Sequence, residues 1–275
     1  MLKYIISVAF TLLSAVMIGQ TNFIQWQAEL KTLLENLARE RNDSLKLIKN
    51  NAFKVKFKQT LEAENSFLFS FDSLQTIGKL VSEDQMVKVY TWNIHLNSGE
   101  FLYFGFIQNK IKKTKDKVYL WELTDQSATV LKPATDVLSP ENWFGALYYE
   151  IIAAKKGKSK HYLLLGWDGN TDFSTKKLIE PLLFGSNGKP KFGAAVFVLK
   201  KGSFKRIIFE YSKRASMALR FDKKLNMIVF DHLSPSEPKY KDNYAYYGPD
   251  FSFDAFKFKK GKWVYIADID ARNKE

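Results

Sequence analysis

The chain has 275 residues, no cysteine, and 42 lysines and arginines against 29 aspartates and glutamates, which gives a formal net charge of +13 at pH 7. The absence of cysteine excludes thiol catalysis, thiolate zinc sites and disulfide exchange. The charge predicts a basic surface, which either attracts polyanions or keeps an aromatic-rich β-protein soluble. Because the lysines occur in short groups along the whole chain, the pattern favours the second interpretation.

Residues 1–20 have the build of a secretory signal peptide. Lys3 precedes an apolar run from Ile5 to Ile18 that contains no charged side chain. A helix over residues 5–18 would span about 21 Å, short of the roughly 30 Å hydrocarbon core of a bilayer. We place the cleavage after Gly19 or Gln20. We therefore expect an exported protein, periplasmic or at the cell surface or extracellular, with no transmembrane helix in the mature chain and no lipid-bearing cysteine.

Residues 23–48 carry the strong helix signal of the chain. Asn42, Asp43 and Ser44 would interrupt it, either as the N-cap of a second short helix or as exposed polar positions. We expect a helical segment over residues 21–65 that packs on the protein's own sheet, with docking of a partner as the alternative. The apolar residues at helical spacing are Phe23, Ile24, Leu30, Leu33, Leu34, Leu37, Leu45 and Ile48.

After this segment, β-branched and aromatic residues alternate with polar ones, which is typical of strands. The alternation predicts a strand over residues 67–72 and a hairpin of residues 86–96 with residues 101–108, turning at Asn97-Ser98-Gly99. Further strands are predicted at residues 117–123, 147–153, 161–166, 194–199, 206–211, 217–221, 227–231, 253–258 and 263–266.

The fold class predicted from these elements is mainly β (α+β). An N-terminal amphipathic helix precedes an antiparallel β-sandwich or a barrel-like meander. The β-rich part is expected to form one domain over residues 66–275, with a division near residue 140 as the alternative, since the stretch around it is rich in loop-forming residues.

Three Lys-Lys-Gly tripeptides, at residues 155–157, 200–202 and 259–261, each lie between predicted strands. A turn that ends in a left-handed glycine is a common hairpin connection, so we interpret them as hairpin tips. The firmest turn prediction is Asn187-Gly188, because this dipeptide tolerates positive φ. Tips that lie at one end of the fold would form a basic rim.

Asp168, Asn170 and Asp172 occupy alternate positions of a glycine-containing loop, the spacing that directs side-chain oxygens at one calcium ion. The pattern departs from an EF-hand at Phe173, where glycine is needed, and at Ile179, where a bidentate glutamate belongs. The same residue types also build ordinary turns, which is the competing interpretation. Calcium is the one cofactor that the sequence suggests.

The sequence identifies no catalytic and no cofactor-binding residue. His95, His161 and His232 show no zinc-ligand spacing. Asp231 and His232 are adjacent on a predicted strand and so point to opposite faces, which prevents one from orienting the other as in a catalytic triad. There is no G-x-S-x-G elbow, no glycine-rich phosphate loop and no pair of carboxylates that stands out as glycosidase residues.

The segment from Tyr240 to Phe251 is rich in tyrosine and should form a loop. A tyrosine ring combines an apolar face with a hydroxyl group, which suits sugar rings and protein interfaces. The alternative is a long loop that its own aromatic residues pin to the core. The residues of this predicted partner-binding surface are Tyr240, Tyr244, Tyr246 and Tyr247.

Two stretches of the chain carry a resemblance to a known group. They are residues 90–106, with Tyr-Thr-Trp-Asn-Ile and Phe-Leu-Tyr-Phe-Gly-Phe, and residues 228–235, with Ile-Val-Phe-Asp-His-Leu-Ser-Pro. In these stretches the chain resembles uncharacterised exported proteins of Bacteroidetes-type bacteria. The resemblance implies a periplasmic or cell-surface setting. It transfers no catalytic motif.

The first functional hypothesis is a non-catalytic envelope or surface protein that binds a macromolecule, anionic or glycan, through hairpin tips and residues 234–251. One alternative is a hydrolase that acts on an envelope polymer or glycan, and another is a structural subunit docked through its N-terminal helix. A deep cleft lined by carboxylates or histidine would favour the hydrolase, whereas a shallow aromatic or basic surface would favour binding. No nucleic-acid motif is present, and oligomeric state is not predicted.

Overall fold

The structure, a computed structural model, describes residues 22–111, 114–156, 159–200, 202 and 204–271. It is mainly β, with 44% of residues in strands and 21% helical. The chain forms two compact units that meet in the sequence between Ile77 and Gly78. The predicted signal peptide lies outside the described residues. Among the helices that are described, none is long and apolar enough to cross a membrane.

The N-terminal unit contains a helix over residues 22–38 and the helix α2 (Asp43–Glu62). Asn42 separates them, and its side chain accepts a hydrogen bond from the backbone N–H of Leu45 at 3.1 Å. Of the two alternatives for residues 42–44, the N-cap of a second helix is therefore confirmed. α2 is longer than the short helix expected, because Phe53, Phe57 and Leu61 continue a buried face at intervals of four residues.

The predicted apolar face of the helical segment is only partly buried. Phe23, Leu30, Leu34 and Leu37 are buried, whereas the remaining members are more exposed. The most exposed of these are Ile24, Ile48 and Leu45.

The strand predicted over residues 67–72 is wrong. Residues 66–68 form the short helix η1 (Ser66–Leu68), and Phe71 has a φ of 55°. Phe71 is fully buried, with its ring centroid 5.5 Å from that of Phe57 and 4.9 Å from that of Phe69. The alternating phenylalanines thus pack on one another and on α2 instead of forming a strand, and a short window of sequence does not distinguish the two.

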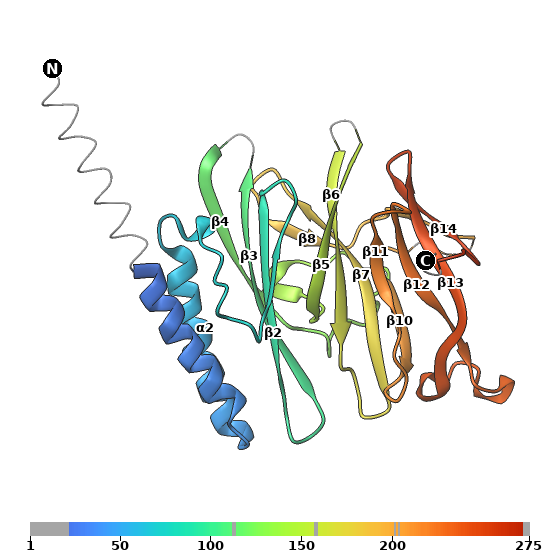
Figure 1. Ribbon diagram of the computed structural model, residues 1–275, viewed down its shortest axis with the longest axis horizontal. Helices are drawn as coiled ribbons and strands as arrows, with labels where there is room; N and C mark the ends of the chain where they lie inside the picture. Colours follow the sequence, from blue (N-terminus) through green and yellow to red (C-terminus); the bar gives the residue numbers. More distant parts are fainter. Residues whose placement is uncertain (1–21, 112–113, 157–158, 201, 203, 272–275) are drawn as a thin grey trace, which may run out of the picture. The chain divides into compact units, whose positions relative to one another are not determined.

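In the described part of the second unit, the strands form three open sheets, which Figure 1 shows in cyan to green, yellow-green to amber, and orange to red. Each sheet has two different edge strands, so the predicted barrel-like form is wrong, while antiparallel pairing is confirmed for every described pair except β9 with β14. In sheet order, the strands of the first sheet are β1 (Gly78–Val81), β2 (Val87–His95), β3 (Phe101–Ile111) and β4 (Thr114–Thr124). Those of the second are β10 (Ile207–Ser212), β7 (Ser174–Phe184), β6 (Ser159–Asp168) and β5 (Leu147–Lys156), with β8 (Pro190–Phe192) on β7. Those of the third are β11 (Leu219–Asp222), β12 (Met227–Pro235), β13 (Tyr247–Lys259), β14 (Lys262–Ile266) and β9 (Phe197–Val198).

The predicted hairpin of residues 86–108 is confirmed, since β2 and β3 pair from Val87 opposite Asn109 to His95 opposite Phe101. The strand predicted at residues 194–199 shrinks to the two residues of β9. β7 was not predicted, because Lys176, Lys177 and Glu180 interrupt its apolar pattern.

The Lys-Lys-Gly tripeptides have different structures. Residues 259–261 connect β13 and β14 as a hairpin, with φ of 49° at Lys260 and 88° at Gly261. β5 and β6 pair up to Lys156 opposite Ser159, but Gly157 lies outside the described residues. The tip predicted at residues 200–202 is wrong, because β9 before it and β10 after it belong to different sheets. The turn predicted at Asn187-Gly188 is confirmed and precedes β8.

Two core clusters lie on opposite faces of the second sheet. On β6, Tyr162 and Leu164 belong to the cluster that includes Val89 and Ile107 of the first sheet. Leu163 and Leu165 belong to the cluster that includes Phe230 and Phe256 of the third. Because both faces of β6 are buried, residues 162–165 read as a continuous apolar run instead of an alternating one.

Two further short helices, η3 (Pro238–Tyr240) and η4 (Tyr244–Tyr246), lie between β12 and β13, and η2 (Pro140–Asn142) precedes β5. The segment from Ser236 to Tyr246 is closed by a hydrogen bond from the backbone N–H of Ser236 to the carbonyl of Tyr246 at 2.9 Å. The tyrosine-rich segment is therefore a compact excursion between two paired strands.

Candidate functional site

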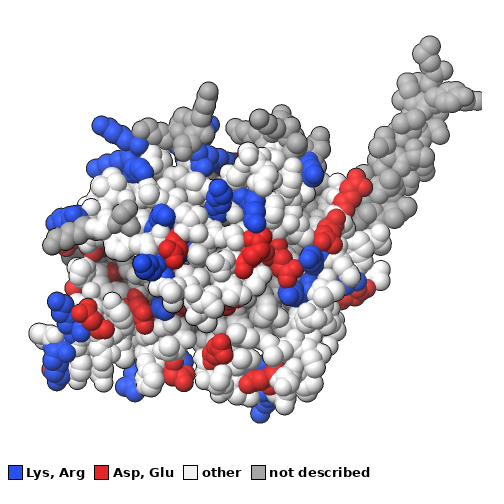
Figure 2. Space-filling view, turned by 180° about the vertical axis from the view of Figure 1, so that it is seen from behind, with Lys and Arg blue, Asp and Glu red and all other residues white. Residues whose placement is uncertain are grey.

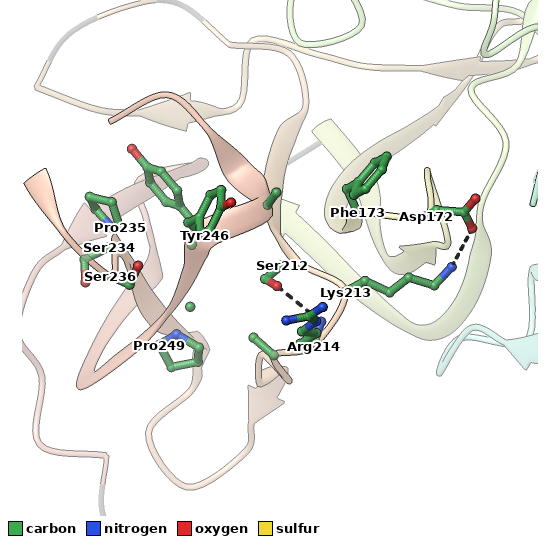
Figure 3. A pocket seen from close by; sticks show the side chains of 14 residues that line it. Asp172, Phe173, Ser212, Lys213, Arg214, Ser234, Pro235, Ser236, Tyr246 and Pro249 are labelled. Atoms are coloured by element: carbon green, nitrogen blue, oxygen red, sulfur yellow. Dashed lines mark hydrogen bonds and ion pairs between the residues drawn. The ribbon is translucent and has the colours of Figure 1, made fainter. Parts of the chain in front are cut away.

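A groove of about 660 Å³ lies where β10 and β12 end and β7 and β13 begin (Figure 3). Because neighbouring strands run antiparallel, these four termini meet at one end of the second and third sheets. The lining residues are Asp172 and Phe173 before β7, Ser212 to Ala215 at the end of β10, Ser234 to Ser236 at the end of β12, and Ala245 to Pro249 at the start of β13.

The groove carries two cationic side chains from the turn after β10. The Nζ of Lys213 lies 3.3 Å from Oδ1 of Asp172, and Figure 3 shows this ion pair beside Phe173. The backbone N–H of Arg214 donates to Oγ of Ser212 at 3.2 Å, which holds the turn in place. Arg214 is exposed, and its guanidinium group forms no ion pair with any residue that the structure describes. Arg214 is thus available to an anionic ligand.

Tyrosine rings form the other wall of the groove. Tyr246 and Tyr247 line the groove, whereas Tyr240 and Tyr244 are not part of its lining. The rings of Tyr240 and Tyr246 stack at 3.9 Å with an angle of 6°, and those of Tyr244 and Tyr247 lie 5.0 Å apart. Tyr246 is 45% exposed. The stacking holds the Tyr246 ring in place while leaving much of it open to the solvent.

A smaller hollow of about 380 Å³ adjoins the groove and shares Lys213 and Ala215 with it. Its lining includes Phe101, Trp167 and Tyr211. The rings of Phe101 and Trp167 meet edge to face at 5.5 Å, which joins the first sheet to the second at this end. The aromatic surface therefore continues beyond the groove.

The three residues of the predicted calcium site point to separate partners. Oδ1 of Asp168 accepts hydrogen bonds from Tyr103 Oη and from the N–H of Asn170, both at 2.9 Å, and burial raises the pKa of Asp168. The Asn170 side chain bonds to Ser174, Glu210 and Lys176. Asp172 instead faces the groove.

Within the described ranges, no group of three or more histidines, aspartates and glutamates is placed to hold a metal ion. Calcium binding at residues 168–172 therefore stays a prediction from the sequence pattern.

A histidine lies next to the groove without lining it. Nδ1 of His232 is 2.8 Å from Oδ2 of the buried Asp254, which also accepts a hydrogen bond of 2.6 Å from the hydroxyl of Tyr265. The carboxylate of Asp231 instead accepts from the N–H of Ala218 at 2.7 Å. Asp231 and His232 thus have separate partners, as the strand alternation predicts.

We expect the pKa of His232 to lie above 6.5, because the hydrogen bond to Asp254 stabilises the imidazolium more than partial burial disfavours it. An NMR titration of the imidazole signals measures this pKa. In Asp254→Asn the pKa is expected to fall, whereas Asp250→Asn should change it less, since Oδ2 of Asp250 is 3.9 Å from Nε2. A pKa that is the same in wild type and Asp254→Asn would contradict the assignment.

The other two histidines are in separate surroundings. His95 stacks on Phe101 at 4.3 Å, and the buried His161 accepts a hydrogen bond from Nε1 of Trp263 at 3.1 Å. Each histidine is thus explained by its own packing.

The sequence predictions named part of the groove. Asp172, Tyr246 and Tyr247 were singled out, although for two different reasons, and the fold brings them to one place. Lys213 and Arg214 were missed, because an adjacent pair of basic residues is common in this chain.

No protein-family model, no curated protein and no solved structure matches the chain. The geometry of the groove is therefore the basis for a functional argument.

Proposed function

We propose that the protein is an exported, non-catalytic binding protein whose groove holds an acidic glycan chain. The observation that carries this proposal is the placement of Arg214 and Lys213 beside Tyr246 and Tyr247 in one solvent-open groove. Cation and aromatic face together are the two features that distinguish an acidic sugar from a neutral one and from a simple anion.

The tyrosine wall suits the sugar ring. The C–H-bearing face of a pyranose is apolar and packs on an aromatic ring, while its hydroxyl groups require polar partners at the rim. Tyr246 presents a partly exposed ring, and the hydroxyl groups of Ser212, Ser234 and Ser236 lie in the same lining. The groove thus offers both kinds of contact.

The basic turn suits the acidic group. A guanidinium group binds a carboxylate or sulfate through two parallel hydrogen bonds, and such charge-assisted bonds are stronger than neutral ones. Arg214 is exposed in the groove and forms no ion pair within the described chain. It is therefore the residue that we assign to the acidic group of the glycan.

The lining supports binding over hydrolysis. Glycoside hydrolysis generally needs two carboxyl groups that face each other across the substrate. The groove lining contains one carboxylate, Asp172, which pairs with Lys213, and no histidine. The hydrolase alternative rests on the His232–Asp254 pair, which lies outside the lining. Docking through the helical segment rests on exposed residues such as Ile24 and Ile48.

The sandwich form of the fold is part of the same proposal. The support is that the second sheet contributes to one core cluster with the first sheet and to another with the third. Sheets that share buried side chains in this way are the layers of a sandwich.

Binding of a polyuronate and of its neutral, carboxyl-reduced counterpart tests the function. The wild type is expected to bind the polyuronate more tightly, and Arg214→Gln should lower that affinity by about 10- to 150-fold, since a charge-assisted hydrogen bond contributes about 1.5–3 kcal/mol. Tyr246→Ala should weaken binding of both glycans by roughly three- to tenfold. Arg39→Gln, an exposed arginine of the helical unit, is the matched control and should bind as the wild type does.

Two results would overturn the proposal. Equal affinity for the acidic and the neutral glycan would show that Arg214 does not bind an acidic group of the ligand. Release of new reducing ends from the polymer, lost in His232→Ala, would establish the hydrolase instead.

A further inference from the structure

The described strand ends on the other side of the β unit form a second surface. β3 ends and β4 begins there, as do β5 and β6, β11 and β12, and β13 and β14. These strand ends lie opposite to the groove, because β12 ends and β13 begins at the groove, whereas β12 begins and β13 ends here. The end of β6 pairs with the start of β7 near the groove, so the start of β6 also lies on this side. Figure 1 shows the ends of β3 and β4, of β5 and β6, and of β13 and β14 along one upper edge.

Lysines dominate this end. We call the set the basic rim, and its described members are Lys110, Lys117, Lys155, Lys160, Lys223, Lys224, Lys259, Lys260 and Lys262. Figure 2 shows lysine and arginine side chains gathered along the upper margin of the face in view. The rim lysines come from the ends of four different strand pairs, so the positive charge is spread over an extended surface and is not confined to one pocket.

Few acidic residues among those described oppose the rim. Glu83 and Asp84 lie in the turn between β1 and β2, and Asp84 forms an ion pair with Lys160. Asp222 caps its own turn by accepting the backbone N–H groups of Lys224 and Leu225 at 2.9 and 3.0 Å. The rim therefore keeps a strong positive potential.

The groove end differs in charge. There, Lys213 pairs with Asp172, and Lys239 pairs with Glu237. Both signs of charge alternate at that end, so the excess positive charge of the described β unit lies toward the rim.

Exposed aliphatic side chains accompany the rim. Leu225 follows Lys223 and Lys224 in the turn between β11 and β12 and is 37% exposed. Val81 ends β1 opposite Lys88 of β2, and Val198 lies in β9 opposite Val264, near the start of β14. Basic residues interspersed with apolar ones are typical of surfaces that dock on anionic bilayers.

We propose that the basic rim docks the protein on an anionic phospholipid surface, with the groove directed away from the membrane. An extended array of lysines matches a plane of phosphate groups, and Leu225 contacts the interface between them. A soluble polyanion would satisfy the charges but would leave the aliphatic side chains without a partner. The docking does not depend on the glycan proposal.

Sedimentation of the full chain with lipid vesicles tests the rim. Binding is expected to be stronger to vesicles that contain phosphatidylglycerol than to phosphatidylcholine alone, and to weaken as the salt concentration rises. Any contribution from apolar residues 5–18 is common to both vesicles, so the difference between them reports the charges.

Two double variants, one of rim lysines and one of lysines at the groove end, test whether vesicle binding depends on the rim or on the net positive charge of the chain. Lys155→Gln with Lys259→Gln is expected to lower partitioning onto the anionic vesicles by about 25-fold, roughly fivefold for each lysine. Lys239→Gln with Lys241→Gln removes the same charge and should lower it by less than about twofold. All four lysines are exposed.

Three outcomes would overturn the docking. The first is equal binding to both kinds of vesicle, and the second is an equal loss of vesicle binding in the two double lysine variants. The third is binding of the protein to soluble dextran sulfate but not to vesicles, which would show that the rim binds a soluble polymer. Arg214→Gln should bind vesicles as the wild type does, so failure of the glycan proposal and failure of the docking are distinguishable.

Discussion

Replacing Arg206 with methionine is expected to lower the free energy of unfolding by about 3–5 kcal/mol, because Glu180 would become an uncompensated charge in the core. Both side chains are fully buried. The Nε of Arg206 bonds to Oε2 of Glu180, and its Nη1 bonds to the carbonyl of Pro133. Burial raises the pKa of Glu180, while Arg206 acts in the opposite direction. Urea denaturation of the wild type and the variant measures the loss.

The double variant Glu180→Leu with Arg206→Met is the control. Removing both charges leaves no buried ion, so its free energy of unfolding should lie close to that of the wild type or above it. A double variant as unstable as Arg206→Met alone would show that the loss comes from packing or from Pro133, and not from the stranded charge. The pair anchors Pro133 on β7, because Arg206 bonds to both Glu180 and the Pro133 carbonyl. The N–H of Lys205 separately donates to the carbonyl of Ala134 at 2.8 Å.

The second large effect is a loss of stability in acid that His161 causes. Burial, and to a lesser extent the charge of Lys262, lowers the pKa of His161 to about 4 in the folded state. Its Nε2 accepts the hydrogen bond from Trp263 and has to stay unprotonated to do so. In the unfolded chain the pKa returns to about 6.5.

The sign follows from these two pKa values. Above pH 6.5 both states hold His161 neutral, and stability is at its full value. Between pH 6.5 and 4 only the unfolded state binds the proton, so stability falls as the pH falls. Below the folded pKa both states are protonated, and the total loss reaches about 3 kcal/mol.

Urea denaturation at several pH values between 7 and 4, for the wild type and for His161→Gln, measures this loss. The glutamine retains an acceptor for Trp263 but does not titrate, so its stability should change less with pH over this range. The same pH slope in both proteins would assign the loss to other groups.

Elements that depend on local residues were predicted well. The β2–β3 hairpin needs only alternation on both sides of Asn97-Ser98-Gly99, and the N-cap at Asn42 needs only its own side chain. β7 was missed because Glu180 is buried in it. Its partner Arg206 is distant in sequence, so an interior glutamate is not recognisable from the strand alone.

The candidate site was predicted only in fragments. Asp172 was singled out for calcium, and Tyr246 and Tyr247 for partner binding, yet they line one groove. Arg214 had no distinguishing signal. The pairing of β7 with β10 and of β12 with β13, together with the core cluster that the second and third sheets share, brings these residues together. Such long-range contacts have no local signature.

The sequence by itself determined the absence of cysteine, the mainly β composition, the helical start with a possible interruption at residues 42–44, and most strand positions, since each depends on residue type and short-range spacing. The tertiary structure decided where charge and aromatic surface gather. Strand direction sends Lys155 and Lys259 to one end of the sheets and Arg214 and Tyr246 to the other. Strand direction and register depend on packing among the sheets. The sequence therefore gives the net charge of +13, but only the folded chain shows that its two ends differ in charge.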